Sequence, residues 1–461
     1  MTAYEKIQTS PRAIGTLAAF TVVAGSMLGV GIFLSPPIVA NNVDSAAALI
    51  LVWVLGGIIA LSGAVACAEL GAMLPRSGGD YVFQYEAFGA SVAFASGWVV
   101  FIGIFCGSVA TLSVALCTYQ LPTLLGYDPS AIAFVLPVTG AVSTAQALAL
   151  VFVASITVIN SLGTHLSVRA QTTLTLIPIS IFSALALYAI TTTSNGPTAA
   201  GGGTDVVPET SLQGFVVAYM AVYFAYAGWI NIIYVAGEVK RPERNVPKAL
   251  IGGTVVVMMV YLLLCTAFIR VLGMEGLRTA GEAGSATAAV VGGDGGRILV
   301  AILIAIAVTA CLNATVLGGA RVAYAMAQRG ALWSRLGMIG ERHKVPHLAL
   351  RLQALIASVL VVTGHFEQLY LMVSLAMVVT GSLTVASLFV LRRTRPGADR
   401  PFRATAYPFF PALYLVSSAL VIVVMTLRAL SGEPGAWYPL LGVGILVVMY
   451  GLHRSVPVWK D

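Results

Sequence analysis

The chain has 461 residues, of which 58% are hydrophobic and only 9% are charged. Ordinary soluble domains carry about 25% charged residues, so this composition excludes a soluble enzyme, a disordered scaffold and a nucleic-acid-binding protein. The formal net charge is +7. In a membrane protein such a surplus reflects Lys and Arg gathered on cytoplasmic loops, so we expect the lipid bilayer as the partner of this surface and no nucleic acid.

Twelve stretches are apolar over about the 20 residues that a membrane-spanning helix needs. Their approximate limits are 14–40, 46–73, 92–118, 143–162, 166–192, 212–237, 248–270, 297–326, 349–364, 367–391, 405–428 and 435–452. The first stretch is too long for a cleavable signal peptide, so we expect it to remain as a span. Residues 121–142 are apolar but short and contain Pro137, and we predict a surface loop that partly re-enters the membrane.

The positive charges are distributed unevenly between the two sides of these spans. With the N-terminus inside, 21 of the 25 Lys and Arg residues fall on the cytoplasmic side, and the others are Arg270, Arg278, Arg297 and Arg428. Lys and Arg accumulate in cytoplasmic loops. We therefore predict a multi-pass protein of the cell (inner) membrane with both termini in the cytoplasm.

The sequence lacks the patterns that mark common catalytic and metal sites. None of the five cysteines forms a C-x-x-C pair, so we predict neither a disulfide framework nor a metal site. We find no Walker motif, no helical H-E-x-x-H and no intramembrane Ser–His–Asp arrangement. The Gly-rich stretches 196–203 and 281–296 read as flexible outside loops. We expect a protein that is not an enzyme and that needs no cofactor.

Charged side chains are almost absent from the centres of the spans, where they are costly. Glu69, Glu238 and Arg321 fall near predicted cytoplasmic ends. They form ion pairs at the helix ends, or they gate a passage through the protein. No buried carboxylate is expected that would hold a cationic substrate.

Two spans carry residues that favour a break in the helix. The first reads VVAGSMLGVGIFLSPP, with Gly25, Gly29 and Gly31 followed by two prolines. Three glycines each weaken a helix by about 1 kcal/mol relative to alanine and allow close approach to the backbone. The sixth has Gly228 mid-span and Asn231 just after it. Close helix packing is the alternative explanation for each span taken singly.

The position of the two breaks is informative because interrupted spans at corresponding places in two halves point to a transporter site. Spans 1 and 6 are five spans apart, and an odd number of spans reverses orientation, so a five-span repeat would be inverted. Unwound helices expose N–H groups at one end and C=O groups at the other. An α-amino acid could thus be bound through its carboxylate and ammonium groups without a buried charged side chain.

Five motifs in this order resemble bacterial members of the amino acid–polyamine–organocation superfamily, closest to the L-amino-acid transporter branch. They are GVGIFLSPP (29–37), AELGAMLPRSGGDYVFQYEAFG (68–89), FAYAGWINIIYVAGEVKRPERNVPKAL (224–250), GGARVAYAMAQRGALW (318–333) and RRTRPGADRPFRATAYPFFP (392–411). The resemblance implies an all-α fold of about 12 transmembrane helices with helices 1 and 6 broken. It implies a five-plus-five inverted repeat of the leucine-transporter type, spanning 1–195 and 196–395, followed by two appended spans in 396–461.

The resemblance also implies roles for particular residues. The substrate carboxylate would be held mainly by backbone N–H groups of Ser26, Gly29, Val30 and Gly31. Backbone carbonyls would receive the ammonium group at Phe224, Ala225 and Ala227. The side-chain pocket would be lined by Ile104, Ser108, Ala376 and Met377. Phe224 would also act as an aromatic lid. Apart from the resemblance, segment 241–248 could pair with Arg76, Asp80 or Glu86 to close the inside, with simple topology charge as the alternative, and Glu238 is a further gating candidate.

Three departures from the family bear on the energy source. Val30 stands where the family has the middle Ser of G-S-G, and Pro178 aligns with the position of a span-5 Lys found in many relatives. Span 8 has no hydroxyl at 318–320, where sodium-coupled members of this fold use them, and a hard cation wants several oxygen ligands. Without Lys or sodium, exchange or facilitated diffusion is the expected mode, and proton coupling stays open.

These observations lead to two transport hypotheses. The main one is a sodium-independent secondary transporter of neutral L-amino acids that works by alternating access as an exchanger. The alternative is a basic amino acid or polyamine antiporter, which the proline on span 5 favours. A channel or an intramembrane enzyme would need a polar stripe or a catalytic constellation that we do not find. Eukaryotic relatives pair with a glycoprotein through a loop cysteine, and the loop 121–142 has none, so we expect no disulfide-linked partner subunit.

Overall fold

The computed structural model describes residues 12–137, 140–192, 211–340, 343, 345–363, 366–431, 437 and 440–455. Within them, ten helical stretches are long and apolar enough to cross a membrane, and His347–Thr363 and Leu441–Ser455 are shorter apolar helices. These twelve segments follow the twelve predicted spans in order. The all-α membrane architecture expected from the sequence is confirmed.

The elements of the first half begin with a broken helix and end with a long one. In chain order they are α1 (Thr16–Met27), α2 (Gly31–Ala40), α3 (Ala46–Met73), α4 (Asp80–Phe88), α5 (Ala90–Trp98), η2 (Val99–Cys106), α6 (Gly107–Ala115), η3 (Leu116–Gln120), α7 (Leu121–Leu125), β1 (Ile132–Leu136), β2 (Gly140–Ser143), α8 (Thr144–Ser161) and α9 (Thr164–Thr192). The elements α5 to α7 form one continuous span, in which η2 and η3 are π-helical.

The second half follows the same pattern, with a broken helix first. Its elements are α10 (Leu212–Tyr226), η4 (Ala227–Ile230), α11 (Asn231–Tyr234), η5 (Ala236–Glu238), α12 (Pro242–Thr279), α13 (Ala283–Gln328), η6 (Ser334–Gly337), α14 (His347–Thr363), α15 (Phe366–Thr394), α16 (Phe409–Leu430) and α17 (Leu441–Ser455).

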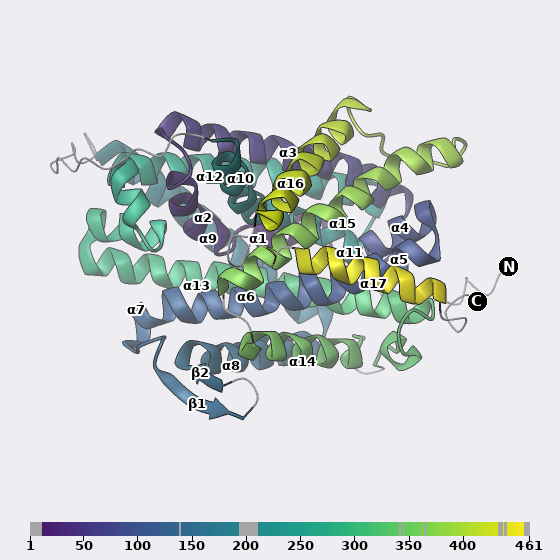
Figure 1. The fold of residues 1–461 in the computed structure, drawn as a ribbon, viewed down its shortest axis with the longest axis horizontal. Helices are drawn as coiled ribbons and strands as arrows, with labels where there is room; N and C mark the ends of the chain where they lie inside the picture. Colours follow the sequence, from purple (N-terminus) through teal and green to yellow (C-terminus); the bar gives the residue numbers. More distant parts are fainter. Residues whose placement is uncertain are drawn as a thin grey trace.

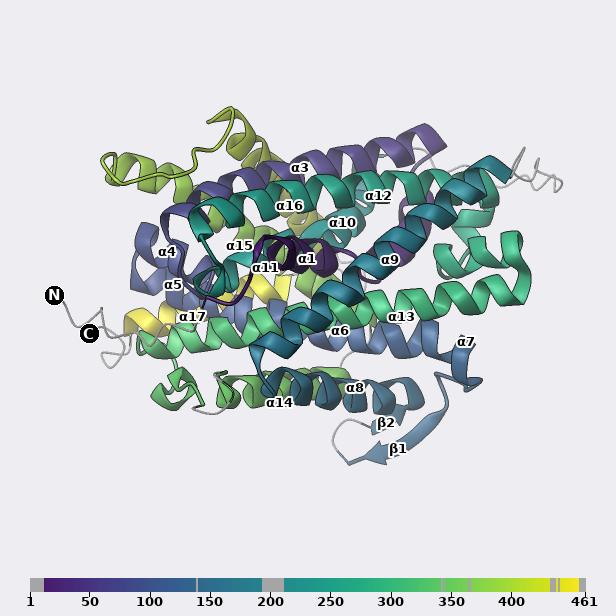
Figure 2. The same cartoon turned by 180° about the vertical axis from the view of Figure 1, so that it is seen from behind.

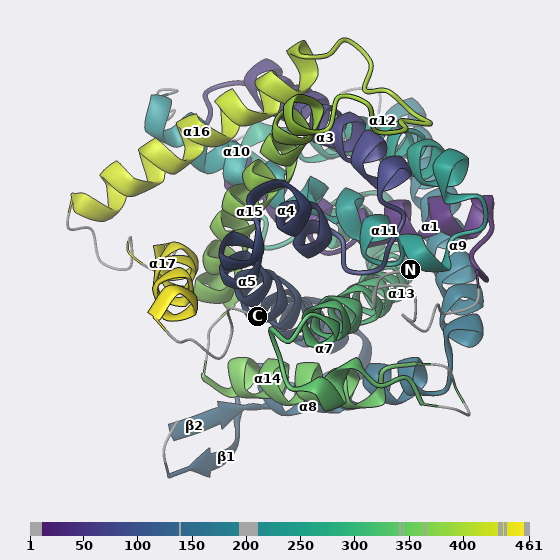
Figure 3. The same ribbon diagram turned by 90° about the vertical axis from the view of Figure 1, so that its right-hand side faces the viewer.

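The broken helices occupy the middle of the bundle. Figure 3 shows the molecule from one end, with α1 and α11 inside a ring that includes α3, α12, α13 and α15. Helices α8 and α14 pack together as an outer layer (Figure 1), and α9 crosses α1, α12 and α13 obliquely (Figure 2). The most apolar window of the α5–α7 span is 94% buried, whereas those of α8, α9 and α16 are only 28% buried. The latter helices therefore present apolar side chains to lipid.

Two predicted loops have a different structure. Residues 121–142 contain α7 and most of an antiparallel hairpin of β1 and β2, which lies at the edge of the molecule (Figure 1). Ile132 and Val135 of β1 are exposed. The predicted surface position is confirmed, and the re-entrant character stays a prediction. The stretch 281–296 is mostly helical, since Glu282 caps α13 by accepting from the N–H of Ser285 at 2.9 Å. A bend at Gly293, with φ 58°, is what remains of the predicted flexible loop.

Candidate functional site

Both predicted helix breaks are present. Helix α1 stops at Met27 and α2 starts at Gly31; between them Leu28 leaves helical geometry with ψ 73°, and the N–H of Gly29 donates to Met27 O at 2.8 Å. On the other side, α10 stops at Tyr226 and continues through the 3-10 turn η4 into the four-residue helix α11. Glycines and the change of helical period interrupt the backbone ladder here, as the sequence indicated.

The two breaks are in direct contact. A Cβ atom added to Gly228 would lie 2.2 Å from the carbonyl carbon and oxygen of Ser26. A Cβ atom added to Gly31 would lie 2.6 Å from the Cα of Ala225. Backbone atoms cannot move aside as a flexible side chain can, so these two positions require glycine because of close approach. The two interruptions therefore form one shared site.

Where the two helix breaks meet, some backbone N–H and C=O groups have hydrogen-bond partners and others do not. The first N–H groups of a helix lack intrahelical partners. In the described part of the chain, the N–H groups of Val30, Gly31 and Ile32 have no backbone acceptor. The hydroxyl of Tyr261 on α12 lies within hydrogen-bond distance of Met27 O and, at 3.0 Å, of Ala225 O. The start of α2 thus offers N–H groups without a backbone acceptor, and α2 packs against α10.

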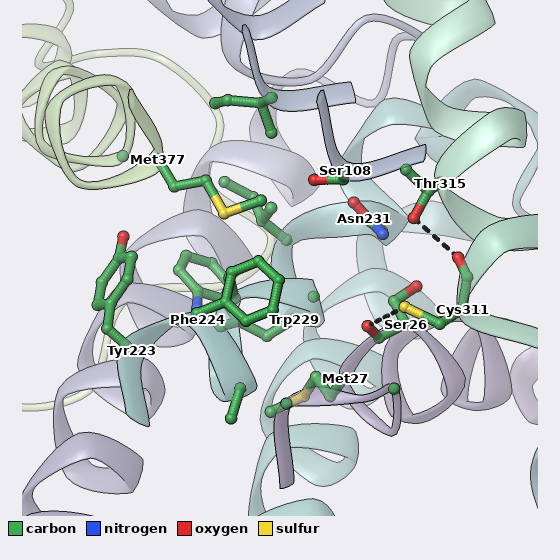
Figure 4. A pocket seen from close by; sticks show the side chains of 18 of the residues that line it. Ser26, Met27, Ser108, Tyr223, Phe224, Trp229, Asn231, Cys311, Thr315 and Met377 are labelled. Atoms are coloured by element: carbon green, nitrogen blue, oxygen red, sulfur yellow. Dashed lines mark hydrogen bonds between the residues drawn. The ribbon is translucent and has the colours of Figure 1, made fainter. Parts of the chain in front are cut away.

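A cavity of about 70 Å³ lies beside the crossing. Figure 4 shows its wall, with Phe224 and Trp229 on one side and Ser108, Asn231 and Thr315 on another. Ten of the eleven residues that the resemblance implied for substrate binding line it. They are Ser26, Gly29, Val30, Gly31, Ile104, Ser108, Phe224, Ala225, Ala227 and Met377.

Ala376 is the exception among the expected pocket residues, because it does not line the cavity. It is fully buried on α15 and faces α17, where a Cβ atom on Gly442 would lie 3.1 Å from the Ala376 Cβ. Successive residues point in directions about 100° apart around a helix, so Met377 reaches the cavity while its neighbour packs against α17.

Asp80 lines the cavity, whereas the sequence analysis named it only as a possible partner of segment 241–248. It begins α4, is 2% exposed, and its carboxylate accepts hydrogen bonds from Tyr234 Oη at 2.7 Å and Thr384 Oγ1 at 2.8 Å. Burial raises the pKa of Asp80 to about 6, although both hydrogen bonds act in the opposite direction. The expectation that the pocket has no carboxylate is therefore wrong. Asp80 lies outside the apolar spans in sequence, and only the fold brings it to the cavity.

The two other gating candidates lie away from the cavity wall. Arg76 is half exposed and pairs with Glu86 at 3.4 Å. Glu238 and Arg321 form an ion pair with a 3.0 Å separation, and both side chains are 3% exposed. Glu86 also pairs with Arg329 and Arg395. In the described ranges we find no ion pair between segment 241–248 and Arg76, Asp80 or Glu86.

Helix α13 meets the break in α1 at a position different from the expected one. Cys311 Sγ donates to Ser26 O at 3.0 Å, and Thr315 lines the cavity one turn later. Glycines 318 and 319 instead pack against Phe105. The stretch of span 8 beside the break therefore does contain a hydroxyl, that of Thr315, which donates to Cys311 O at 2.8 Å.

A neutral polar network connects α9, α13 and α8 to the base of the break. Asn160 Nδ2 donates to Asn313 Oδ1 at 3.0 Å, and Asn313 Nδ2 donates to Gln171 Oε1 at 2.9 Å. Gln171 and Thr175 in turn reach Thr21 O at 3.4 and 3.3 Å. Helix α9 thus contacts α1 here through amide and hydroxyl side chains and not through a lysine side chain.

The fold and site define a class of protein: a multi-pass membrane protein with two broken helices around a small central cavity. The sequence profile named Amino acid permease matches residues 14–450, and the chain belongs to that family. The protein is an amino acid transporter and not an enzyme.

Curated relatives are similar along nearly the whole chain. The serine/threonine exchanger SteT of Bacillus subtilis is 29% identical, over 96% of this chain and 97% of the relative. The b(0,+)-type amino acid transporter 1 of Homo sapiens is 27% identical, over 93% and 85%. The cystine/glutamate transporter of Homo sapiens is 26% identical, over 97% and 85%. These relatives are named for different substrates. Membership of the family therefore shows amino acid transport, but it does not show which amino acids this protein carries.

Proposed function

We propose that the protein exchanges neutral L-amino acids across the cell membrane by alternating access, without sodium. The observation that carries this proposal is the contact between the two helix breaks beside a cavity. The N–H groups of Val30 and Gly31 would bind the substrate carboxylate, and carbonyl groups at the end of α10 would bind its ammonium group. Phe224 closes the cavity over the bound molecule.

The size of the cavity supports a short substrate. The cavity volume is about 70 Å³, which favours a molecule of few non-hydrogen atoms over a long one. Alanine, serine and threonine are short amino acids, and arginine is much longer. The relative named for serine/threonine exchange is in line with a neutral substrate.

Asp80 favours the alternative, a basic amino acid or polyamine antiporter. Its carboxylate lies in the cavity wall, where a second positive charge on a substrate could pair with it. However, two hydroxyl donors already occupy this carboxylate. We therefore retain the neutral substrate as the main proposal.

Sodium independence is supported by the partners of the carbonyl groups at the break. A hard cation needs several oxygen ligands at once. Here Ser26 O accepts from Cys311, while Met27 O and Ala225 O face the hydroxyl of Tyr261. Protein donors thus occupy oxygens that a sodium ion would need.

The test is uptake into proteoliposomes that are preloaded with an unlabelled amino acid, with choline in place of sodium and with a clamped pH gradient. We expect labelled serine or alanine to enter faster when the inside is loaded, because an exchanger is trans-stimulated. Uptake of arginine alone would establish the antiporter alternative instead. Uptake that requires sodium would contradict the proposed mode.

We also propose that spans 1–5 and 6–10 are inverted repeats and that both termini face the cytoplasm. The orientation rests on the distribution of Lys and Arg. All five native cysteines are buried, which permits labelling of an introduced cysteine. An impermeant maleimide added to intact cells should label Asp128→Cys, and it should label Asp399→Cys only after permeabilisation. The reverse pattern would overturn the orientation.

A further inference from the structure

The cavity wall contains seven hydroxyl-bearing side chains, and all but one are hydrogen-bonded within the described residues. Tyr223 pairs with Tyr414, Tyr234 donates to Asp80, and Ser26, Thr315 and Thr380 donate to the carbonyl one turn earlier in their own helices. Ser108 on α6 is the exception. Its side chain is 6% exposed, and its Oγ has no hydrogen-bond partner in the described residues.

Asn231 lies beside Ser108 on the same side of the cavity (Figure 4). It is the first residue of α11, directly after the turn that interrupts the sixth span. Its side chain is 9% exposed, and its carboxamide makes no hydrogen bond to any other described residue. Two buried polar side chains, from helices far apart in sequence, therefore face the cavity with unused donors and acceptors.

Buried polar groups are normally paired, and leaving one unpaired is costly. A bound ligand that supplies the missing partner is one way to remove that cost. A carboxamide and a hydroxyl together offer both donors and acceptors, which suits a ligand hydroxyl that donates one hydrogen bond and accepts others. The opposite side, formed by Phe224 and Trp229, is aromatic (Figure 4).

We propose that Ser108 and Asn231 are the specificity-determining pair of this transporter and that they select a short, hydroxyl-bearing L-amino acid, of the size of serine or threonine. This inference rests on the proposed function and deepens it. The substrate's carboxylate and ammonium groups bind at the helix breaks, and its side-chain hydroxyl bonds to Ser108 Oγ and to the carboxamide of Asn231. A site built to pair a substrate hydroxyl discriminates against an analogue that lacks it, because its own buried groups are then left unpaired.

The first experiment uses the full-length wild-type protein in preloaded proteoliposomes. Competition against labelled serine is measured for serine and for 2-aminobutyrate, which replaces the hydroxyl by a methyl group of similar size. The same comparison is made for threonine and valine. We expect the hydroxyl-bearing member of each pair to compete about tenfold better. Equal competition within both pairs would overturn the proposal even if both molecules are carried.

The second experiment compares variants by the ratio of kcat/KM for serine to that for alanine. Ser108→Ala and Asn231→Leu should each lower this ratio about five- to tenfold, mainly through serine. Ser113→Ala is the matched control, because Ser113 lies on the same helix, is also buried without a hydrogen-bond partner, and does not line the cavity. Its ratio should equal that of the wild type.

The outcomes separate the two levels of inference. Equal losses for serine and alanine in Ser108→Ala and Asn231→Leu would mean that the pair binds groups common to all amino acids, and the specificity proposal would be wrong. If the wild type carries arginine but neither serine nor alanine, the proposed function itself fails. If a variant does not fold, the competition experiment on the wild-type protein still decides the question, because it needs no substitution.

Discussion

At the scale of single residues, the most unusual group is the buried Asp80. Its carboxylate connects α4 to α11 through Tyr234 and to α15 through Thr384. Gln84, one turn later on α4, donates to Thr384 Oγ1 at 2.9 Å and to Thr380 O at 3.1 Å. This cluster joins the inner part of the broken sixth span to span 10, so changes at Asp80 should affect stability as well as transport.

The raised pKa of Asp80, about 6 against an ordinary 3.8, gives a prediction for stability. A carboxyl whose pKa is higher in the folded than in the unfolded state stabilises the fold below pH 3.8, and this contribution is lost as the pH rises through about 6. Asp80→Asn cannot ionise and lacks this loss. We therefore expect the Tm of Asp80→Asn minus that of the wild type to become more positive between pH 5 and pH 7.5, measured by thermal unfolding in detergent.

The control for this measurement is Asp294→Asn. Asp294 undergoes the same chemical change but is 88% exposed, so its Tm difference from the wild type should not follow the same trend. A Tm difference for Asp80→Asn that is constant over this pH range would show that the carboxyl has an ordinary pKa.

Phe224 is the second residue whose role can be tested singly. If it covers the bound amino acid, Phe224→Ala should lower kcat/KM for exchange by about tenfold or more, because the open cavity loses both apolar contact and the exclusion of water. Phe152→Ala on α8, a partly exposed helix, should leave exchange near the wild-type rate. Counterflow measured at equal protein density compares the two. Unchanged exchange in Phe224→Ala would remove the lid from the mechanism.

At the scale of elements, the decisive feature is the contact between the two interrupted helices. Each is interrupted because glycine removes the side chain at the crossing, and the backbones then meet more closely than any Cβ atom allows. The hydroxyl of Tyr261 and the thiol of Cys311 approach carbonyls that the interruption leaves open. The site is thus built mainly from backbone, with few side chains that bear its chemistry.

This contact predicts that Gly228→Ala is severely damaging. The new Cβ atom would lie 2.2 Å from backbone atoms of Ser26, so one of the two breaks must move. We expect exchange to be abolished, with a lower yield of monodisperse protein in size-exclusion chromatography. Gly252→Ala on α12 is the control, because no atom lies within 4 Å of its new Cβ, and alanine favours a helix. Normal exchange in Gly228→Ala would argue against contact between the breaks.

At the scale of the whole molecule, buried ion pairs join elements that are distant in sequence. Glu69 at the end of α3 binds Arg392 of α15 at 2.5 Å and Arg400 at 3.3 Å, and Glu238 after α11 binds Arg321 of α13 at 3.0 Å. In the orientation that we propose, these pairs would lie on the cytoplasmic side and would close the inner face. They are expected to break or rearrange when the cavity opens to the cytoplasm.

The Glu238–Arg321 pair allows a double-variant test. Removing one member of a buried pair leaves an uncompensated charge and costs about 3–5 kcal/mol, whereas replacing both by apolar or neutral groups is often close to neutral. We expect Arg321→Met to lower the Tm strongly and Glu238→Gln/Arg321→Met together to restore most of it. Arg297→Met, which breaks an exposed pair with Asp294, should change the Tm little. Additive losses in the double variant would show that the two side chains do not depend on each other.

The sequence alone determined the class of the protein, the order of its spans and the location of both helix breaks. These properties follow from local sequence patterns, namely apolar runs of bilayer length and glycines grouped near the middle of spans 1 and 6. The ten cavity-lining residues named in advance came from the resemblance to a known family, not from local sequence patterns.

Only the tertiary structure decided which side chains complete the site. Asp80 begins a short polar helix outside the spans, and no periodicity indicates that it reaches the cavity. Ala376 and Met377 are adjacent in sequence, yet they separate by helix rotation that packing against α17 sets. Cys311, rather than residues 318–320, contacts the break, because packing sets the register of the long helix α13 against α1. Contacts between helices depend on their register and rotation, which a linear sequence pattern does not contain.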